Sequence, residues 1–351
     1  MKILLPFQDP YNRPLSHKIV SGGTEQFMKS IKDNFDTIVY QIPIEQIKLF
    51  NQKEKVEIAQ NIVNLAEAYK VDVICCNFAQ AVYNSQTLIE SNIPIMFIEH
   101  CVYPIPNTIY RWVQGIKRGH SMFLVSKWQE KKYEQMAKRT NIDVLKIAGY
   151  LNPSYCKVKP KMVEPEYDCG TIGRCDNGKS PFKLKTMTKG KDIKSLVLTS
   201  QTQFPKDLPY YEKHKDWDDV LWDLPYNKVM ENIAKCNTYF STWDKETWGI
   251  TSMEALSCGI PVILNSDKDG DHASEIIPAD KSHYIKIPKD DKDALVKAIK
   301  SFDNIDRKAI QQATWDKHNK EQWKKDFTNA VDKTIEIFRS KNGGRFKNGT
   351  T

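Results

Sequence analysis

Two glutamates lie eight residues apart, one in a predicted loop and one in the predicted helix that follows it. Glu246 comes just after a strand end, and Glu254 lies inside a predicted helix over residues 247–258. The amino terminus of a helix has unpaired N–H groups and partial positive charge, which attract phosphates and hydroxyls. Because Gly249 permits close backbone approach, the two carboxylates are candidate ligand-binding groups. The alternative is an ordinary crossover with solvated glutamates.

Two cations occupy a similar place earlier in the chain. Arg174 ends a short predicted strand, and Lys179 stands at the start of the next predicted helix. A guanidinium offers a planar fork to phosphate oxygens, and an ammonium offers a point charge. Arg174 and Lys179 are therefore candidates for a diphosphate clamp, with two solvated surface cations as the alternative.

Three residues in the first half of the chain also follow strands. Gly22 and Gly23 stand between a strand at residues 2–5 and an apolar-periodic helix, without forming a dinucleotide-binding G-x-G-x-x-G sequence. His100 follows a predicted strand at residues 93–98, and ligands of open parallel sheets bind at strand carboxyl ends. Taken alone, a glycine pair is more often a turn, and a single histidine is more often structural.

The elements that must position these residues alternate between strand and helix. Alternation of this kind predicts an α/β protein with doubly wound parallel sheets. Further strands are predicted at residues 37–42, 71–76, 121–125, 144–147, 195–199, 220–222, 238–241 and 261–264. Helices are predicted at residues 44–69, 80–90, 127–138, 225–235, 247–258, 290–302 and 318–339. The predicted parts are a first domain (1–150), a linker (151–166), a second domain (167–317), a terminal helix (318–340) and a mobile tail (341–351).

Composition limits the class of protein. A chain of 351 residues with 40% hydrophobic residues can build two cores. It has no apolar run long enough to cross a membrane, and its first residues lack the apolar core of a signal peptide. Eight cysteines without a C-x-x-C pair predict a reduced, cytoplasmic protein without structural zinc. The net charge of +8 favours an anionic partner, although a lysine-rich solubilising surface has the same composition.

The stretch ETWGITSMEALSCGIPVI at residues 246–263 resembles the donor motif of family-4 retaining glycosyltransferases, E-x7-E followed by a small residue, Gly and Pro-Val-Ile. That family has the GT-B fold, in which two Rossmann-like doubly wound domains face a central cleft. The resemblance implies that Glu246 contacts the donor sugar and that Glu254 contacts the nucleotide ribose. It also implies that a run of backbone amides holds the sugar and phosphate, at Trp248, Gly249, Ile250 and Thr251.

The resemblance extends to the other candidates and departs at two positions. The Gly-Arg-x4-Lys pattern that contains Arg174 and Lys179 is similar to the family's diphosphate site. Gly22 and Gly23 would lie beneath the diphosphate, and His100 near the sugar O6 and the reaction centre. Trp248 stands where Phe is usual, and Lys245 where Pro is frequent.

The resemblance implies a retaining transfer from a nucleotide-diphosphate sugar, for which we expect a UDP-sugar. The residues expected to take part in the chemistry are His100, Arg174, Lys179 and Glu246. Arg174 and Lys179 would stabilise the leaving diphosphate, so no metal ion is expected.

The acceptor is predicted from two basic runs. The first contains Arg111, Lys117, Arg118, Lys127, Lys131, Lys132, Lys138 and Arg139, interleaved with Tyr110, Trp112, Trp128 and Tyr133. The second contains Lys183, Lys185, Lys189, Lys191 and Lys194. Basic and aromatic residues together suit a phosphate backbone and a stacked base.

The favoured acceptor is therefore 5-hydroxymethylcytosine in DNA, because the compact chain resembles the phage enzymes that modify this base. Such an enzyme would act in the host cytoplasm. The alternatives are a cell-envelope glycosyltransferase at a membrane surface, a catalytically inactive GT-B binding module, and solvated helix faces with no partner. No obligate protein partner is expected.

Overall fold

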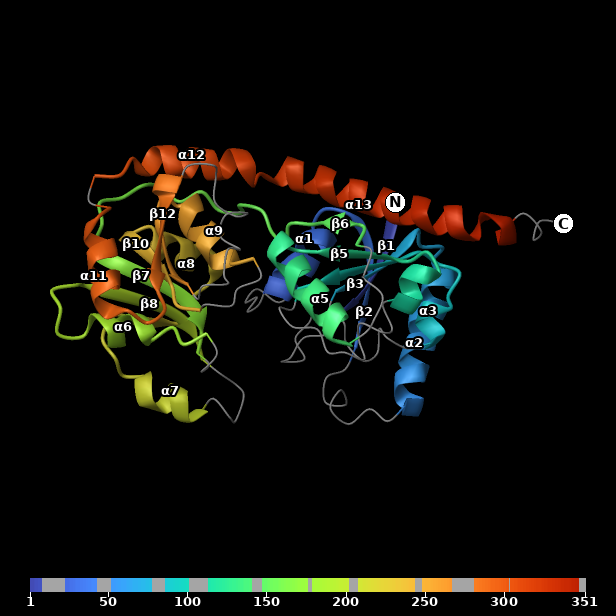
Figure 1. The fold of residues 1–351 in the computed structure, drawn as a ribbon, viewed down its shortest axis with the longest axis horizontal. Helices are drawn as coiled ribbons and strands as arrows, with labels where there is room; N and C mark the ends of the chain where they lie inside the picture. Colours follow the sequence, from blue (N-terminus) through green and yellow to red (C-terminus); the bar gives the residue numbers. More distant parts are fainter. Residues whose placement is uncertain are drawn as a thin grey trace. The chain divides into compact units, whose positions relative to one another are not determined.

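The computed structural model describes residues 1–7, 23–42, 52–77, 86–100, 113–140, 147–175, 179–201, 208–243, 248–266, 281–302 and 304–346. The chain divides into two compact units. Unit 1 comprises Met1–His17, Gly22–Pro153 and Trp323–Thr351, and unit 2 comprises Lys18–Ser21 and Ser154–Gln322. Figure 1 shows a strand-and-helix architecture within each unit.

Unit 1 is built on a six-stranded parallel sheet in the order β2-β1-β3-β4-β5-β6. Its strands are β1 (Lys2–Phe7), β2 (Asp36–Gln41), β3 (Val73–Asn77), β4 (Ile95–Glu99), β5 (Ser121–Leu124) and β6 (Gly149–Tyr150). Helices α1 (Gly23–Lys32), α2 (Gln52–Ala68), α3 (Gln86–Ile89) and α5 (Lys127–Thr140) belong to this unit, together with most of α13 (Lys320–Phe346).

The inner strands β1, β3, β4 and β5 of unit 1 are buried on both faces, which explains their continuous apolar sequences, whereas the edge strands β2 and β6 are partly exposed. Leu4 and Phe97 pack with Ile62 of α2 on one face. Neighbouring residues of a strand point to opposite faces, and Ile3 and Leu5 are also fully buried. Helical spacing places Phe27 and Ile31 of α1 in the core, as their apolar period predicts.

Helix α13 packs on unit 1 through aromatic rings. Trp323 and Phe327 lie against Phe27 at centroid distances of 6.2 Å each, and Phe338 stacks on His120 at 5.4 Å. The helix continues to Phe346 and so includes the first residues of the tail that is predicted to begin at residue 341. Two side-chain hydrogen bonds hold these last turns: Lys341 donates to the Ile116 carbonyl (3.0 Å) and Asn342 to the Arg118 carbonyl (2.8 Å).

Unit 2 is built on a second six-stranded parallel sheet in the order β12-β11-β10-β7-β8-β9. Its strands are β7 (Tyr167–Arg174), β8 (Ser195–Ser200), β9 (Val220–Trp222), β10 (Cys236–Ser241), β11 (Val262–Ser266) and β12 (Tyr284–Pro288). Its helices include α6 (Lys183–Thr188), α7 (Leu208–His214), α8 (Tyr226–Ile233), α9 (Ile250–Ser257), α11 (Lys292–Lys300) and α12 (Arg307–Lys317).

Helices cover both faces of this second sheet. Helices α6 and α11 contribute Leu184, Met187 and Leu295 to a core with Phe240 and Ile263 of the strands. Helices α8 and α9 contact the opposite side, and α12 packs on α9. Figure 1 shows α6 and α11 away from α8 and α9. Both units are therefore doubly wound α/β layers, which confirms the predicted fold class.

Several elements differ from the sequence prediction. The strand expected at residues 144–147 is β6 at Gly149–Tyr150, and residues 144–146 lie outside the described part of the chain. Helix α6 begins at Lys183, so Lys179 lies in the preceding turn and not in the helix. Helices α7 and α12 and strand β12 were not predicted.

A close backbone approach at Gly259 generates a prediction. Gly259 has φ +78°, and an added Cβ would lie 2.4 Å from the Arg307 carbonyl oxygen. Arg307 cannot easily move, because its guanidinium donates to the carbonyls of Val163 and Ala234. We expect Gly259→Ala to lower the free energy of unfolding of unit 2 by about 3 kcal/mol, from left-handed strain plus overpacking.

The measurement is urea unfolding, with Gly190→Ala as the matched control. Gly190 has φ +75°, and nothing lies within 4 Å of an added Cβ. This control therefore carries only the conformational cost of roughly 1–2 kcal/mol. Equal losses in the two variants would contradict the role assigned to the Arg307 contact.

Candidate active site

The candidate site lies where the strand order of unit 2 reverses. Strands β7 and β10 are neighbours, with Thr238 opposite Cys169 and Tyr239 opposite Gly170. The chain proceeds from β7 outward through β8 and β9, and from β10 in the other direction through β11 and β12. Such a switch point leaves a crevice at the strand carboxyl ends, where ligands of doubly wound sheets bind. The candidate cations follow β7, and the glutamate motif follows β10, so both segments leave the sheet at this point.

Lys179 contacts the residues that follow β10. The Thr242 hydroxyl donates to the Lys179 carbonyl at 2.6 Å, and the Lys179 Nζ lies 3.6 Å from the centroid of the Trp243 ring. A Cβ on Gly173 would be 3.8 Å from the Lys179 Cβ, so Lys179 also lies beside the end of β7. Arg174 is exposed at that strand end. The structure thus brings Lys179 to the end of β10, and Arg174 is the last residue of the neighbouring strand β7.

The amino terminus of α9 has no cap from the side chain of its N-cap residue. Gly249 is its N-cap residue at φ 75° and ψ 56°, a left-handed conformation that favours glycine. Because Gly249 has no side chain, the N-cap residue itself makes no side-chain capping hydrogen bond. The Tyr239 hydroxyl lies 2.8 Å from the Thr251 hydroxyl and 3.4 Å from the Ile172 carbonyl, which ties α9 to β10 and β7. Backbone N–H groups at this helix end suit an anion or sugar hydroxyls.

Trp248 packs into the protein and does not present its ring to a ligand. Its side chain is 4% exposed and meets the His318 ring edge to face at 5.9 Å. Its Nε1 is buried and has no hydrogen-bond partner among the described residues. The usual Phe would fill the same apolar space without a buried donor, so the contribution expected of Trp248 comes from its backbone.

Glu254 is buried on α9 beside the start of α8. The carboxylate is 4% exposed and accepts a hydrogen bond from the Tyr226 hydroxyl. Burial raises the pKa of Tyr226, and the nearby Glu254 charge raises it further. Burial, followed by the same carboxylate, raises the pKa of the Cys156 thiol to about 12. Sequence reasoning missed Tyr226 as a neighbour of Glu254, because Tyr226 lies in another helix.

The other predicted residues lie either outside the described part of the chain or in unit 1. Gly22 and Glu246 lie outside the described residues. Gly23 is the first residue of α1, and His100 follows β4, both in unit 1. The His100 residue is half-buried, with its Nε2 atom inside the protein and its ring 5.3 Å from that of Phe27. Burial lowers the pKa of His100 from 6.5 to about 3.

The His100 environment generates a prediction about its charge. We expect the imidazole to be neutral at pH 5 in the folded protein, measured from its ring carbon shifts by NMR. The folded pKa lies below the unfolded one, so the folded state binds fewer protons between about pH 6.5 and 3. Its stability contribution is full above pH 6.5 and falls by about 1.4 kcal/mol per pH unit below it.

The control is the same protein unfolded in urea, where His100 should titrate near its ordinary pKa. The signal is identified by its loss in His100→Gln. Titration of His100 near pH 6.5 in the folded protein would contradict the assignment of a buried, neutral ring.

The two basic runs differ from the surface that the sequence predicts. In the first, Trp128 and Tyr133 are only 7% and 2% exposed, because they pack inward. The prediction of an interleaved basic and aromatic face is therefore wrong for these two residues. Its exposed basic residues in the described part are Lys117, Arg118, Lys127, Lys131 and Lys138. Tyr110, Arg111 and Trp112 lie outside the described residues.

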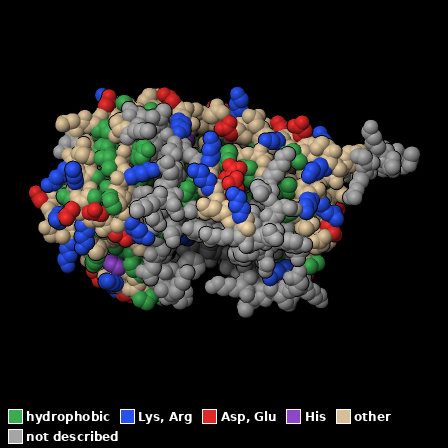
Figure 2. All heavy atoms as spheres, viewed as in Figure 1, with side chains coloured by type: hydrophobic (Ala, Val, Ile, Leu, Met, Phe, Trp, Pro, Cys, Tyr) green, Lys and Arg blue, Asp and Glu red, His purple; other side chains and the backbone are tan. Residues whose placement is uncertain are grey.

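The second run is largely paired with acidic side chains. Lys183 contacts Asp290 at 2.8 Å, Lys185 contacts Asp219 at 3.7 Å, and Lys191 contacts Asp293 at 3.0 Å. Figure 2 shows Lys and Arg side chains scattered among Asp and Glu side chains on the visible face. These pairings reduce the positive charge that the second run offers to a polyanion.

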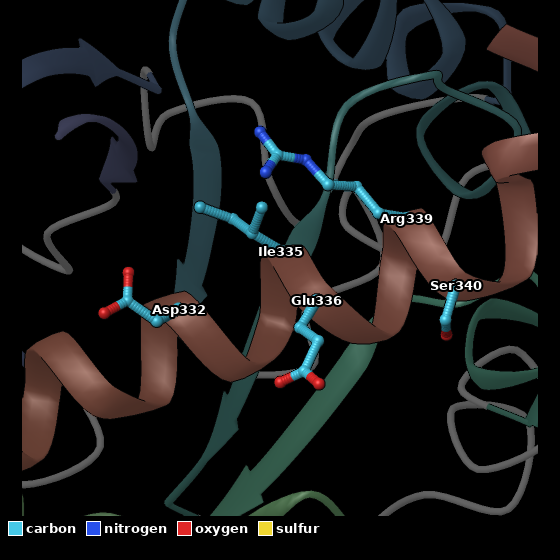
Figure 3. Close-up of a pocket in the computed structure, with 5 residues that line it drawn as sticks. All are labelled: Asp332, Ile335, Glu336, Arg339 and Ser340. Atoms are coloured by element: carbon cyan, nitrogen blue, oxygen red, sulfur yellow. The ribbon is translucent and has the colours of Figure 1, made fainter. Parts of the chain in front are cut away.

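A hollow on α13 does not coincide with the site. Its lining consists of Asp332, Ile335, Glu336, Arg339 and Ser340, all from one helix. In Figure 3, Ile335 and Arg339 point to one side of α13, and Glu336 and Ser340 to the other. Side chains that diverge in this way do not define a common binding point.

The described residues contain neither a membrane-spanning helix nor a cluster of metal ligands. None of the described helices combines the length and apolar character required to cross a membrane. Within the same described ranges, no group of three or more His, Cys, Asp or Glu side chains is placed to hold a metal ion. The seven described cysteines are buried and form no disulfide with one another.

Comparison with known proteins supports the same region. Residues 175–321 match the family model described as Glycosyl transferases group 1. The matched segment contains Lys179, Glu246 and Glu254 and begins directly after Arg174. No curated protein sequence matches the chain.

Solved structures with the same architecture cover nearly the whole chain. HepE from Anabaena, in complex with UDP and glucose, has a TM-score of 0.67 at 13% identity, covering 95% of this chain and 99% of that one. A glycosyltransferase from Rickettsia africae ESF-5 has a TM-score of 0.64 at 16% identity, covering 97% and 98%. The lipopolysaccharide outer core galactosyltransferase WaaB has a TM-score of 0.61 at 16% identity, covering 94% and 99%. The likeness establishes the GT-B fold, and together with the family match it supports a GT-B glycosyltransferase.

Proposed function

We propose that the protein is a retaining glycosyltransferase that uses a nucleotide-diphosphate sugar, with a UDP-sugar as the expected donor. The observation that supports this proposal is that Lys179, beside the end of β7, contacts Trp243 after β10, while Tyr239 links Thr251 of α9 to the same two strands. Two cations and a helix amino terminus suit a diphosphate. The group 1 match over residues 175–321 and the UDP complexes of HepE support the donor class.

The proposed chemistry stabilises charge on the leaving group. The bond between the sugar C1 and the diphosphate oxygen breaks, while the acceptor oxygen bonds to C1 from the same face. The acceptor proton passes to an oxygen of the leaving diphosphate. Arg174 and Lys179 stabilise the negative charge that develops there, which requires no protein nucleophile and no metal ion.

The other residues have binding roles in this proposal. Glu246 contacts the sugar hydroxyls, and Glu254, oriented by Tyr226, contacts the ribose. The backbone from Trp248 to Thr251 holds the sugar and phosphate. Gly22 and Gly23 approach the diphosphate, and His100 approaches the sugar as a neutral hydrogen-bonding group. Its lowered pKa favours this neutral role over that of a cation.

For the acceptor, a glycan or lipid-linked glycan is the first candidate and hydroxymethylated DNA the second. The burial of Trp128 and Tyr133 removes two stacking groups from the proposed DNA face, and ion pairs reduce the charge of the second lysine run. Exposed Lys127, Lys131 and Lys138 on α5 still favour an anionic partner. The name of WaaB, a lipopolysaccharide galactosyltransferase, supports the glycan alternative.

The clamp generates a kinetic prediction. We expect Lys179→Ala and Glu246→Ala each to lower kcat/KM at least tenfold, about 1.4 kcal/mol of transition-state stabilisation. Lys300→Ala is the matched control, because Lys300 is an exposed lysine at the end of α11 in the same unit and belongs to neither the candidate site nor the basic runs. If Lys179→Ala and Glu246→Ala retain wild-type turnover, the donor site has been assigned wrongly.

The acceptor class is tested with UDP-α-glucose, UDP-α-galactose and UDP-α-N-acetylglucosamine. Each is offered with hydroxymethylated duplex DNA, lipopolysaccharide cores and simple glycosides, in the presence of EDTA. We expect an α-linked product on a glycan acceptor, identified by mass and by the anomeric NMR signal. A modified duplex with no glycan product would favour DNA. A β-linked product or complete loss of transfer in EDTA would contradict the mechanism, and nucleotide binding without any transfer would indicate an inactive binding module.

A further inference from the structure

Lys179 and Trp243 form a close contact between an ammonium and an aromatic face. The Nζ lies 3.6 Å from the ring centroid, whereas the other such contacts in the described residues range from 4.5 Å to 5.7 Å. Both residues are half-buried. Attraction between a cation and the ring quadrupole operates within about 6 Å and strengthens as water is removed. This pair therefore lies well inside the effective range.

Hydrogen bonds fix the backbone on both sides of the contact. The Thr242 hydroxyl donates to the Lys179 carbonyl, and Asn265 Nδ2 donates to the Thr242 carbonyl at 3.0 Å. Asn265 is held in turn by Asp290, whose N–H donates to the Asn265 Oδ1 at 2.8 Å. The residue before Trp243 and the backbone of Lys179 are thus connected through β11. The remaining conformational freedom is that of the flexible Lys179 side chain, and contact with the Trp243 ring restricts it.

An aromatic ring holds a cation without adding a formal negative charge. Lys183 and Lys191 in the same unit contact carboxylates, which offset their charge. At the switch point, the Lys179 ammonium lies over the indole ring of Trp243. An ammonium held by a ring keeps its attraction for phosphate oxygens, and a lysine that is already ordered loses less side-chain entropy on binding.

We propose that Trp243 is a positioning residue for the diphosphate: its ring holds the Lys179 ammonium at the carboxyl ends of β7 and β10 and thereby raises affinity for the donor's diphosphate. This inference rests on the proposed function, since it assigns a role toward the same ligand. Trp243 acts through Lys179, so its effect must vanish when the ammonium is absent.

The test is a double-mutant cycle on the full chain, with nucleotide binding measured by calorimetry. The probes are UDP, GDP and ADP, and the cycle uses the one that wild type binds most tightly. We expect Trp243→Leu to weaken binding about tenfold and Trp243→Phe, which keeps a smaller aromatic face, about threefold. In the Lys179→Met background, Trp243→Leu should change the dissociation constant by less than about twofold. Trp217→Leu, which removes another half-buried tryptophan of unit 2, should bind as wild type does.

A second measurement needs no ligand. The ε-methylene protons of Lys179, assigned by their loss in Lys179→Met, should show an upfield ring-current shift that disappears in Trp243→Leu. Binding by Trp243→Leu within twofold of wild type, or an equal loss in the Lys179→Met background, would overturn the positioning role. If wild type binds none of the three nucleotides while the ring-current shift persists, the proposed function fails and the inference fails with it. By contrast, unchanged nucleotide binding by Trp243→Leu would contradict the inference but not the proposed function.

Discussion

The candidate site depends on one constraint of the second sheet: β7 and β10 are paired neighbours although the chain leaves them in opposite directions. Main-chain hydrogen bonds set the register of these two parallel strands, with Thr238 opposite Cys169. In a doubly wound sheet, the connections from two such strands lead away in opposite directions, which leaves a crevice between their carboxyl ends. The residues directly after each strand therefore meet. Lys179 after β7 and Trp243 after β10 are the observed result.

Much of the fold follows from patterns that the sequence displays openly. Continuous apolar runs mark strands buried on both faces, and Pro225, Gly259 and Pro261 mark element ends. Helix α12 was not predicted from the sequence because most of its residues are polar. Of its residues, Ile310, Gln311 and Thr314 are buried, and the burial of the two polar ones depends on the neighbours that α12 meets in the fold. Strand β12 was not predicted because this edge strand, YIKIP, has only a short alternation of apolar and polar residues.

The candidate site residues come from motifs in the sequence, whereas the neighbours that surround them do not. A motif names Glu254, yet the Tyr226 hydroxyl that bonds it lies in another helix. Likewise, Lys183 and its partner Asp290 are 107 residues apart, so a run of lysines looked like a free cationic surface. Helical period alone did not reveal which side of α5 faces the core, and Trp128 was assigned to the wrong side. Such pairings arise from the path of the chain, which composition does not encode.

The lysines of unit 2 show how one residue type can take two electrostatic roles within a small domain. Where a lysine contacts a carboxylate, as Lys191 does with Asp293 at 3.0 Å, both charges are offset and the exposed pair adds little stability. At the switch point, a carboxylate partner would compete directly with a diphosphate for the Lys179 ammonium. A tryptophan face attracts the same cation without that competition. The chemistry of the proposed ligand therefore explains why an aromatic residue at the end of β10 suits Lys179 better than an acidic one.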